Sequence, residues 1–169
     1  MTQWTTRAEA PADRAAIHQI NAAAFATEAE ADLVDALRAD PDAWIDGLSW
    51  VAVAPDGTLA AHALLTRCHV EGRPALALAP CATLPVHQGQ GAASAAIRAA
   101  LDAAVRMGES LVLVLGHSDY YPRFGFLPAS RWGIRAPFEV PDEAMMALVL
   151  DSDVPVPSGV IRYAAPFGV

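Results

Sequence analysis

The segment Gln88–Ala93, which reads Gln-Gly-Gln-Gly-Ala-Ala, has the composition of a phosphate-binding loop. It precedes a predicted helix, and the N–H groups in the first turn of a helix have no partners within that helix. Together with the helix dipole, these groups favour an anion at the N-terminus. Gly89 and Gly91 would let a ligand approach the backbone closely. The loop alone leaves two interpretations open, a phosphate or pyrophosphate site and a tight strand-to-helix turn.

Two common phosphate-binding motifs do not fit this segment. The motif G-x-x-x-x-G-K-[ST] needs a lysine, and the chain contains none. A dinucleotide fingerprint needs G-x-G-x-x-G near the first strand, followed after about 20 residues by an acidic residue. Here the Gly-x-Gly lies in the middle of the chain and the third glycine is absent.

Other side chains with catalytic chemistry are scattered along the chain. The five histidines show no metal-ligand spacing such as H-x-x-x-H, so we predict no metal site. His69 and His117 lie near predicted strand ends and titrate in a useful pH range, although an isolated histidine is more often a surface residue. No G-x-S-x-G elbow supports a Ser-His-Asp arrangement.

Three longer helices, and a short aromatic-rich turn of helix at Asp119–Phe124, are predicted to position these groups. The clearest is Gly91–Met107, in which Ile97, Leu101 and Val105 repeat every four residues. An earlier helix follows Asp13. Another starts near Thr27, and Glu30 three residues later gives the spacing of a capping box.

The remaining pattern predicts strands joined by turns. The expected strands are Trp4–Ala8, Leu48–Ala54, Leu59–Val70, Ala75–Leu84, Leu111–Leu115, Arg131–Phe138 and Ala144–Leu150. The order of elements predicts an α/β fold, a mixed sheet with helices on its faces. We expect a single domain over residues 1–169, with a core at about 4–150 and a Pro-rich C-terminal extension at 151–169.

Composition and charge exclude several classes of protein. Apolar residues make up 54% of the chain and charged residues 18%, which excludes intrinsic disorder. The formal net charge of −8 argues against nucleic-acid and membrane partners. No apolar run reaches the length that a membrane span needs. Cys68 and Cys81 lack C-x-x-C spacing and are expected as free thiols, which predicts a cytoplasmic protein.

Two motifs in this order resemble the GNAT superfamily of acetyl-CoA-dependent N-acetyltransferases. Gln88–Ala93 fits the signature Q/R-x-x-G-x-G/A, and Tyr121–Phe126 matches the element Y-x-x-x-G-F after the fifth strand. Leu115-Gly116 and the segment Glu30–Arg38 are similar to a bacterial subgroup of predicted acetyltransferases. The resemblance spans roughly residues 4 to 150 and implies an acyl-CoA N-acyltransferase fold, with a mostly antiparallel mixed sheet flanked by helices.

The resemblance also implies acetyl-CoA as cosubstrate. Backbone amides of the loop would bind the pyrophosphate, and the main chain of the preceding strand would pair with the pantetheine arm as an extra strand does. The residues implied to bind the cofactor are Ala82, Thr83, Leu84, Gln88, Gly89, Gln90, Gly91, Ala92 and Ala93. Amides and a helix dipole would hold the anionic ligand without a basic patch.

Two catalytic residues are candidates within this resemblance. Tyr121 would be the general acid that protonates the departing CoA thiolate, because a phenol and a thiol have comparable pKa values. Packing of the aromatic cluster is the alternative for Tyr121, and packing is favoured for Tyr120. Glu30 lies in the helices that would shape the acceptor pocket, but a capping role is favoured over a role as base. Cys81 is expected as a small apolar filler.

The sequence therefore predicts an N-acetyltransferase that transfers the acetyl group directly to a primary amine. The acceptor, a small molecule or a peptide, is left open. The alternative is a catalytically weak CoA-binding or acyl-CoA-binding sensor with the same fold. A homodimer is possible through the apolar segment Val154–Phe167.

Overall fold

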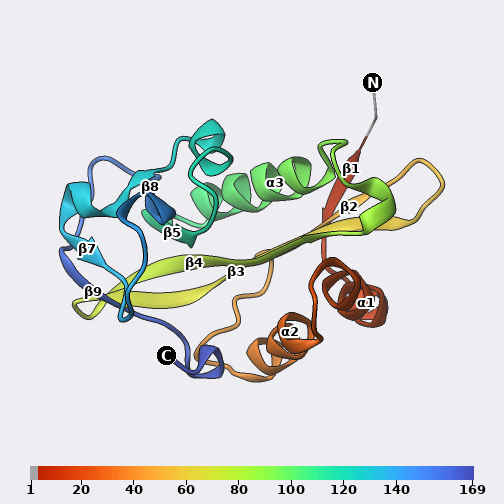
Figure 1. Ribbon diagram of the computed structural model, residues 1–169, viewed down its shortest axis with the longest axis horizontal. Helices are drawn as coiled ribbons and strands as arrows, with labels where there is room; N and C mark the ends of the chain where they lie inside the picture. The colour runs from red at the N-terminus through yellow and green to blue at the C-terminus, as the bar shows by residue number, and fades with distance from the viewer. Residues whose placement is uncertain (1–3) are drawn as a thin grey trace.

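The computed structural model describes residues 4–169 and places one nine-stranded sheet at the centre of the molecule (Figure 1). The first three residues of the predicted domain lie outside this description. The strands are β1 Thr5–Ala8, β2 Ser49–Val53, β3 Leu59–Val70, β4 Arg73–Thr83, β5 Leu111–Leu115, β6 Leu127–Pro128, β7 Ile134–Arg135, β8 Met145–Val149 and β9 Gly159–Arg162.

The sheet is mixed and mostly antiparallel. Its order is β1-β2-β3-β4-β5-β8-β6, and β9 pairs with both β3 and β7. Only the pairs β4–β5 and β7–β9 are parallel among the described strands. The sheet predicted from the sequence is therefore confirmed.

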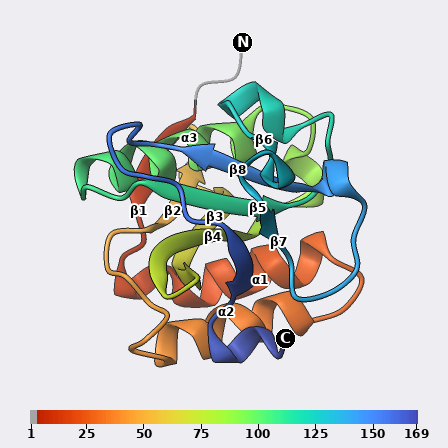
Figure 2. The same ribbon diagram turned by 90° about the vertical axis from the view of Figure 1, so that its left-hand side faces the viewer.

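Three α-helices in residues 4–169 cover the two faces of this sheet. They are α1 Arg14–Ala24, α2 Ala29–Ala39 and α3 Ala92–Arg106. Figures 1 and 2 show α3 on one face and α1 with α2 on the other. Each helix buries its apolar side against the sheet face that it covers, as Ile17, Val34 and Ile97 show.

Helix α3 closely follows its predicted pattern. Gly91 is its N-cap residue, and Gly108, with a φ of +81°, follows its C-terminal end. Ile97 and Leu101 are buried against the sheet as expected, whereas Val105 is 51% exposed. A helix has 3.6 residues per turn, so a row that repeats every four residues drifts around the helix axis, and its last member, Val105, lies off the face that Ile97 presents to the sheet.

The predicted strand Arg131–Phe138 is wrong over most of its length. Residues Ala129–Trp132 form a 3-10 turn, and only β7 within the range is extended and paired. Gly133, with a φ of +71°, separates the turn from β7. Pro137 has no N–H to donate to a ladder, so pairing does not continue beyond it.

The C-terminal segment forms part of the sheet. Strand β9 pairs with β3 at His69 and Val70, and Ile161 is buried. Figure 2 shows the 3-10 turn Ala165–Phe167 beside α2, and Phe167 packs against the core between α2 and the sheet. Within the segment that suggested a homodimer interface, Ile161 and Phe167 therefore pack inside the chain itself, whereas Val154 and Val160 are exposed.

A fork between β4 and β5 is the feature that organises the site. The two strands pair only at Leu76 with Val112 and at Ala77 with Leu113. Just beyond, β4 contains one more residue than β3, because Ala63 and Leu65 of β3 lie opposite Cys81 and Leu78 of β4. Such a bulge bends a strand and increases its twist. The rest of β4 thus leaves β5 and exposes one main-chain edge.

Candidate active site

The loop before α3 forms one end of the candidate site. Gly89 and Gly91 have φ values of +76° and +84°, a conformation that favours glycine. A Cβ added at either position would meet no atom within 4 Å, so this backbone is open to a ligand. The first amide that makes an intrahelical hydrogen bond in α3 is that of Ala95, which donates to the Gly91 carbonyl at 3.0 Å. The three amides before it have no partner within α3 and can donate to an anion.

Trp4, near the N-terminus, anchors this loop with its side chain. Its indole Nε1 donates to the Gln90 carbonyl at 2.8 Å, and its ring meets His87 edge-on with centroids 5.6 Å apart. Within the loop, the amide of Gln88 donates to the Pro85 carbonyl at 3.3 Å. The Gln88 amide, which the sequence assigned to the cofactor, is therefore already used.

The hydrogen bonds of β4 reduce the number of residues that can contact a pantetheine arm as predicted. The Leu84 amide donates to the Ala60 carbonyl of β3 at 2.8 Å, and the Leu84 carbonyl accepts from His87. Antiparallel pairing alternates, so the main chain of Ala82 also points toward β3, whereas that of Thr83 points toward the fork. Of the three predicted residues, Thr83 alone offers main-chain groups to a ligand in the fork.

A cavity of about 290 Å³ connects the loop to the aromatic segment after β5. Its lining includes Thr83, the loop glycines, Ser94, Tyr120 and Arg123. The Tyr120 hydroxyl and Ser94 Oγ are 2.8 Å apart. The Arg123 guanidinium lies 4.2 Å from the centre of the Tyr120 ring, while its Nε donates to the Tyr120 carbonyl. A cation is thus held beside the amides at the start of α3.

Sequence reasoning missed Arg123. One arginine is not a basic patch, so the expectation that amides and a helix dipole hold the anionic ligand stays a prediction, with a single cation beside these amides. The signal was present, since Arg123 lies inside the motif Tyr121–Phe126. Its position beside a loop some thirty residues earlier follows only from the way the 3-10 turn Tyr121–Phe124 packs against α3.

Tyr121 lies at the fork, on the face of the sheet that α3 covers. Its ring contacts Tyr120 and Phe126, with centroids 5.0 and 5.9 Å away. Gly116 directly follows β5, and a Cβ there would overlap Cε2 of the Tyr121 ring. Only glycine leaves room for this ring position. The aromatic cluster that the sequence offered as an alternative therefore exists, and it fixes the ring while leaving the role of the hydroxyl open.

Cys81 of β4 is the neighbour of the Tyr121 hydroxyl. Burial raises the pKa of the Cys81 thiol to about 12, so this thiol stays protonated and is a poor nucleophile. Burial and the nearby Cys81 thiol also raise the pKa of the Tyr121 phenol. Tyr121 therefore remains a neutral phenol. Any thiolate placed beside it would be strongly basic, because burial raises the pKa of thiols in these surroundings.

The other candidate acid–base residues lie away from this cluster. Glu30 is half-buried on α2, on the sheet face opposite Tyr121, and it forms no capping box with Thr27. The Thr27 hydroxyl instead accepts from the Ala29 amide at 3.3 Å. The His117 side chain is exposed, and His69 lies beside Arg162 of β9, where partial burial lowers its pKa. None of these three side chains lines the cavity beside the loop.

A buried polar chain that the sequence did not reveal crosses the other face of the sheet. The Ser49 hydroxyl donates to Glu9 at 2.7 Å and lies 2.8 Å from His62 Nε2. His62 Nδ1 is 3.2 Å from the Asn21 amide nitrogen, and Arg38 donates to Glu9 twice. The Asn21 amide donates to Nδ1 of His62, and the Ser49 hydroxyl, whose own proton goes to Glu9, accepts from Nε2. His62 is therefore neutral with its proton on Nε2. Burial lowers the pKa of His62 to about 4.

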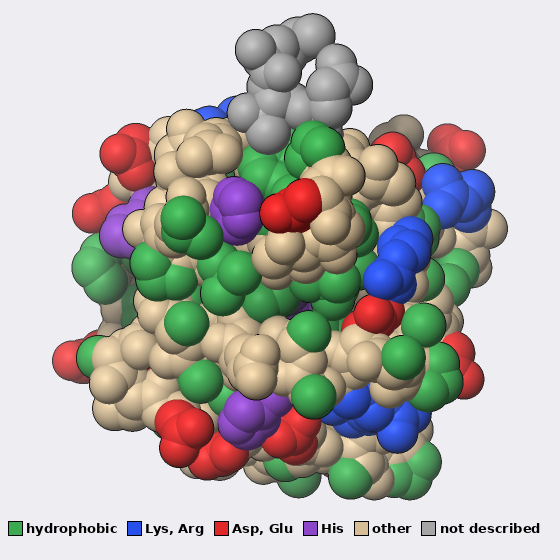
Figure 3. Space-filling model, turned by 90° about the vertical axis from the view of Figure 1, so that its right-hand side faces the viewer, with side chains coloured by type: hydrophobic (Ala, Val, Ile, Leu, Met, Phe, Trp, Pro, Cys, Tyr) green, Lys and Arg blue, Asp and Glu red, His purple; other side chains and the backbone are tan. Residues whose placement is uncertain are grey.

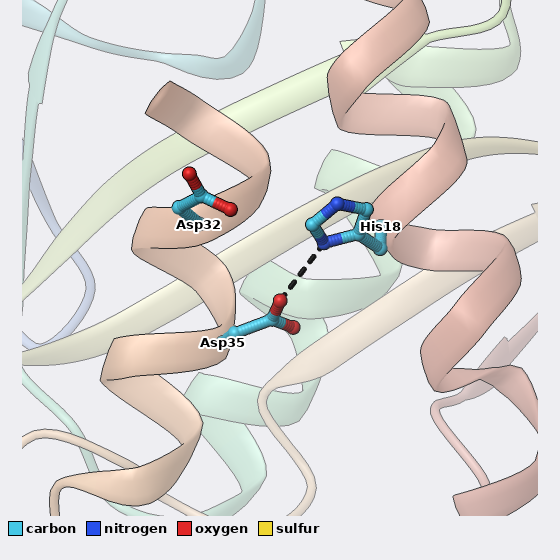
Figure 4. Close-up of side chains that lie close together, drawn as sticks. All are labelled: His18, Asp32 and Asp35. Atoms are coloured by element: carbon cyan, nitrogen blue, oxygen red, sulfur yellow. Dashed lines mark hydrogen bonds and ion pairs between the residues drawn. The ribbon is translucent and has the colours of Figure 1, made fainter. Parts of the chain in front are cut away.

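A histidine–carboxylate group also joins α1 to α2 (Figure 4). His18 Nδ1 lies 2.8 Å from an oxygen of Asp35, and Asp32 is close by. Both carboxylates are exposed, and the ion pair between His18 and Asp35 accounts for the grouping. We assign this group a role in helix packing rather than a metal.

The surface near the start of α3 carries mixed charge. On the face shown in Figure 3, arginine side chains lie in separate groups among acidic and apolar ones. No helix of residues 4–169 is long and apolar enough to cross a membrane.

Together, the forked mixed sheet, the glycine loop at a helix N-terminus and the tyrosine at the fork define the acyl-CoA N-acyltransferase class of fold. The family comparison agrees with this architecture. Residues 14–126 match the model of the acetyltransferase (GNAT) family, and the chain belongs to that family.

Relatives of known name share most of the chain. The uncharacterized N-acetyltransferase YjhQ of Escherichia coli K12 is 36% identical over 162 residues, covering 91% of this chain and 88% of its own. The uncharacterized N-acetyltransferase YhbS of the same strain is 30% identical over 131 residues, covering 76% and 77%.

Two solved structures resemble the fold over its whole length. The crystal structure of YhbS from E. coli in complex with CoA has a TM-score of 0.90 at 26% identity, covering 100% of this chain and 94% of that one. A GNAT acetyltransferase from Brucella melitensis in complex with acetyl-CoA has a TM-score of 0.78 at 29% identity, covering 99% of each chain.

Proposed function

We propose that the chain transfers an acetyl group from acetyl-CoA directly to a primary amine. The fork between β4 and β5, which leads from Tyr121 to the open amides of the Gly89–Gly91 loop, is the observation that carries this proposal. It offers an edge strand for an amide-bearing arm and a helix N-terminus for phosphates in one continuous path. The CoA-bound and acetyl-CoA-bound relatives support the choice of ligand.

Each part of the path has a task in this reaction. Acetyl-CoA supplies a thioester whose acyl carbon can accept an amine and release a thiolate. The amides at the start of α3 and Arg123 bind the phosphates, and the main chain of Thr83 orients the arm in the fork. Tyr121 then donates its phenol proton to the departing thiolate.

The amine has to be neutral when it attacks. For an amine with the pKa of lysine, removing the extra proton at pH 7 costs about 4–5 kcal/mol. The new C–N bond replaces the C–S bond, the amine loses a proton to solvent, and the Tyr121 oxygen is reprotonated from solvent. Glu30 is left out of this proposal, because it lies on α2, across the sheet from Tyr121 and the loop. The two free cysteines fit the cytoplasmic location predicted from the sequence.

Acetyl-CoA is expected to raise the melting temperature of the protein. A ligand at a hundred times its Kd adds about 2.7 kcal/mol, or roughly 5–10 °C for a chain of this size. Gly91→Asp should abolish this shift, because its carboxylate would occupy the same amides and repel the phosphates. Differential scanning fluorimetry with acetyl-CoA measures both effects.

Gly108→Asp is the matched control for backbone strain, because Gly108 has a φ of +81° against +84° for Gly91 and lies beyond the opposite end of α3. Gly91→Asn adds nearly the same bulk without the charge, so it should retain part of the shift. A full shift in Gly91→Asp, or none in the unaltered chain, would contradict the cofactor site.

Arg123→Gln is expected to raise the KM for acetyl-CoA by about two- to fivefold, the range of an exposed ion pair. It should also weaken the dependence of that KM on ionic strength, because one cation no longer faces the phosphates. Arg106→Gln, at the exposed C-terminal end of α3, is the control. Steady-state kinetics at two salt concentrations would show the difference, and an identical salt dependence in all three proteins would remove Arg123 from the site.

A further inference from the structure

A second cavity opens at the fork, on the sheet face opposite α3. It has a volume of about 230 Å³ and begins where β4 and β5 separate, at Ala77, Ala79, Leu113 and Leu115. Side chains alternate along β5, so Leu113 and Leu115 point away from Val112 and Val114, which pack on the α3 side. The cavity and Tyr121 thus lie on opposite faces of the same fork.

The C-terminal part of the chain forms the outer wall of this cavity. Phe138 and Tyr163 are stacked, with centroids 6.2 Å apart and planes inclined by 15°. Tyr163 also meets Phe167 at 5.4 Å. These rings face the aliphatic side chains of β4 and β5, and within residues 4–169 every side chain that lines the cavity is uncharged. Val169 alone brings a main-chain carboxylate to the lining.

From this arrangement, and resting on the proposed acetyl transfer, we propose that the cavity receives the body of the acceptor, a monoamine carried on an aromatic or branched aliphatic group. An amine held there meets the thioester from the side opposite Tyr121, so the entering nitrogen and the acid do not compete for space. An enclosed, dry cavity of about 150 Å³ lined by apolar side chains binds benzene. The cavity here is larger and open to solvent at Leu115 and Val169, so it has room for a phenyl ring with a short linker.

The lining also selects against other amines. Apart from the Val169 carboxylate, the lining offers no charged partner to a second ammonium group on the acceptor, and an unpaired charge in apolar surroundings is unfavourable. Apolar surroundings favour the neutral form of the single amino group, which is the form that attacks. Polyamines, aminoglycosides and lysine-rich peptides are therefore disfavoured acceptors.

Binding measurements separate this proposal from the acetyl-transfer proposal. With the protein saturated by CoA, calorimetric titration is expected to give a Kd for 2-phenylethylamine about 10- to 100-fold lower than for ethylamine or putrescine, the effect of burying one large apolar group. Equal Kd values would overturn the acceptor class even if acetyl-CoA still stabilises the protein. Failure of the thermal shift with acetyl-CoA would instead count against the acetyl-transfer proposal.

Leu115→Asp tests the cavity itself, because it places a carboxylate among the lining residues. The preference for 2-phenylethylamine over ethylamine should disappear, whereas Val105→Asp on the outer side of α3, at 51% exposure against 44% for Leu115, should keep it. Phe138→Ser provides a second variant if Leu115→Asp does not fold. Retention of the preference in a folded cavity variant would overturn the proposal.

A longer acyl group is the competing occupant, and hexanoyl-CoA distinguishes it. If hexanoyl-CoA binds about tenfold more tightly than acetyl-CoA and Leu115→Asp removes that difference, the cavity takes the acyl chain and the proposed acceptor class is wrong. Similar affinity for the two thioesters, together with the amine preference, supports the acceptor body.

Discussion

Replacing Tyr121 by phenylalanine is expected to lower kcat by about 100-fold or more, the usual contribution of a general acid. The reason is the surroundings of the phenol. Burial raises the pKa of the Cys81 thiol to about 12. The CoA thiolate would depart in the same surroundings, so it would be a strong base and a poor leaving group unless it is protonated. The ring contacts with Phe126 and Gly116 do not depend on the hydroxyl, so stability should hardly change. Thiol release measured under saturating acetyl-CoA gives kcat.

Tyr120→Phe is the comparison that separates the acid from the aromatic cluster. It removes the hydroxyl that bonds Ser94 beside the phosphate amides, so it should act on the KM for acetyl-CoA rather than on kcat. The melting temperatures of both variants show whether they are folded. If Tyr121→Phe keeps its kcat, the phenol has no role beyond packing, and Tyr121 is not the general acid of the reaction.

The second large effect is a loss of stability in acid that depends on His62. The folded state holds this imidazole neutral, with a pKa lowered to about 4, whereas in the unfolded chain its pKa is about 6.5. Between these values the unfolded state binds more protons. The contribution is therefore fully present above pH 6.5 and is lost as the pH falls toward 4.

From pH 7.5 to pH 4.5, this difference is expected to remove about 2–3 kcal/mol from the free energy of unfolding. Carboxylates such as Asp13, whose pKa is lowered mainly by its hydrogen bond with Arg7, add to the acid sensitivity. The His62 part is isolated with His62→Gln, whose amide can still donate to Ser49 and accept from Asn21. Urea unfolding at several pH values in this range gives the free energy of unfolding at each pH. This free energy should fall less steeply with decreasing pH in the variant than in the original chain.

His117→Gln is the matched control, because the His117 side chain is exposed. It should follow the original chain across the whole pH range. A His62→Gln variant that loses stability as steeply as the original chain would show that His62 protonates without cost, and the buried network would then have to admit water.

Local sequence patterns were enough to predict much of this protein. The glycines at 89 and 91, followed by small apolar residues, predicted the start of α3, and an apolar repeat with Gly108 predicted its end. These features depend on the preferences of a few neighbouring residues, so a short window contains them. The same two motifs predicted the GNAT family and its fold, which the comparisons and the sheet confirm.

Other features depend on residues far apart in the chain. Glu9 is 40 residues from Ser49, and His62 is 41 residues from Asn21, so no spacing rule could reveal the buried polar chain. The C-terminal strand also depends on distant residues, because residues 159–162 form a strand by pairing with β3 and β7. A short apolar run has no fixed structure until a partner strand is available to it.

The sequence by itself determined where a phosphate could bind, which tyrosine could serve as an acid and which family the chain belongs to. Tertiary structure decided which amides are free, that Arg123 joins them, that Glu30 lies across the sheet from Tyr121, and that aromatic side chains of the tail close a cavity at the fork. The physical reason is that backbone conformation follows from near neighbours. Strand pairing, burial and the shape of a cavity follow from contacts between distant segments, which form only when the whole chain folds.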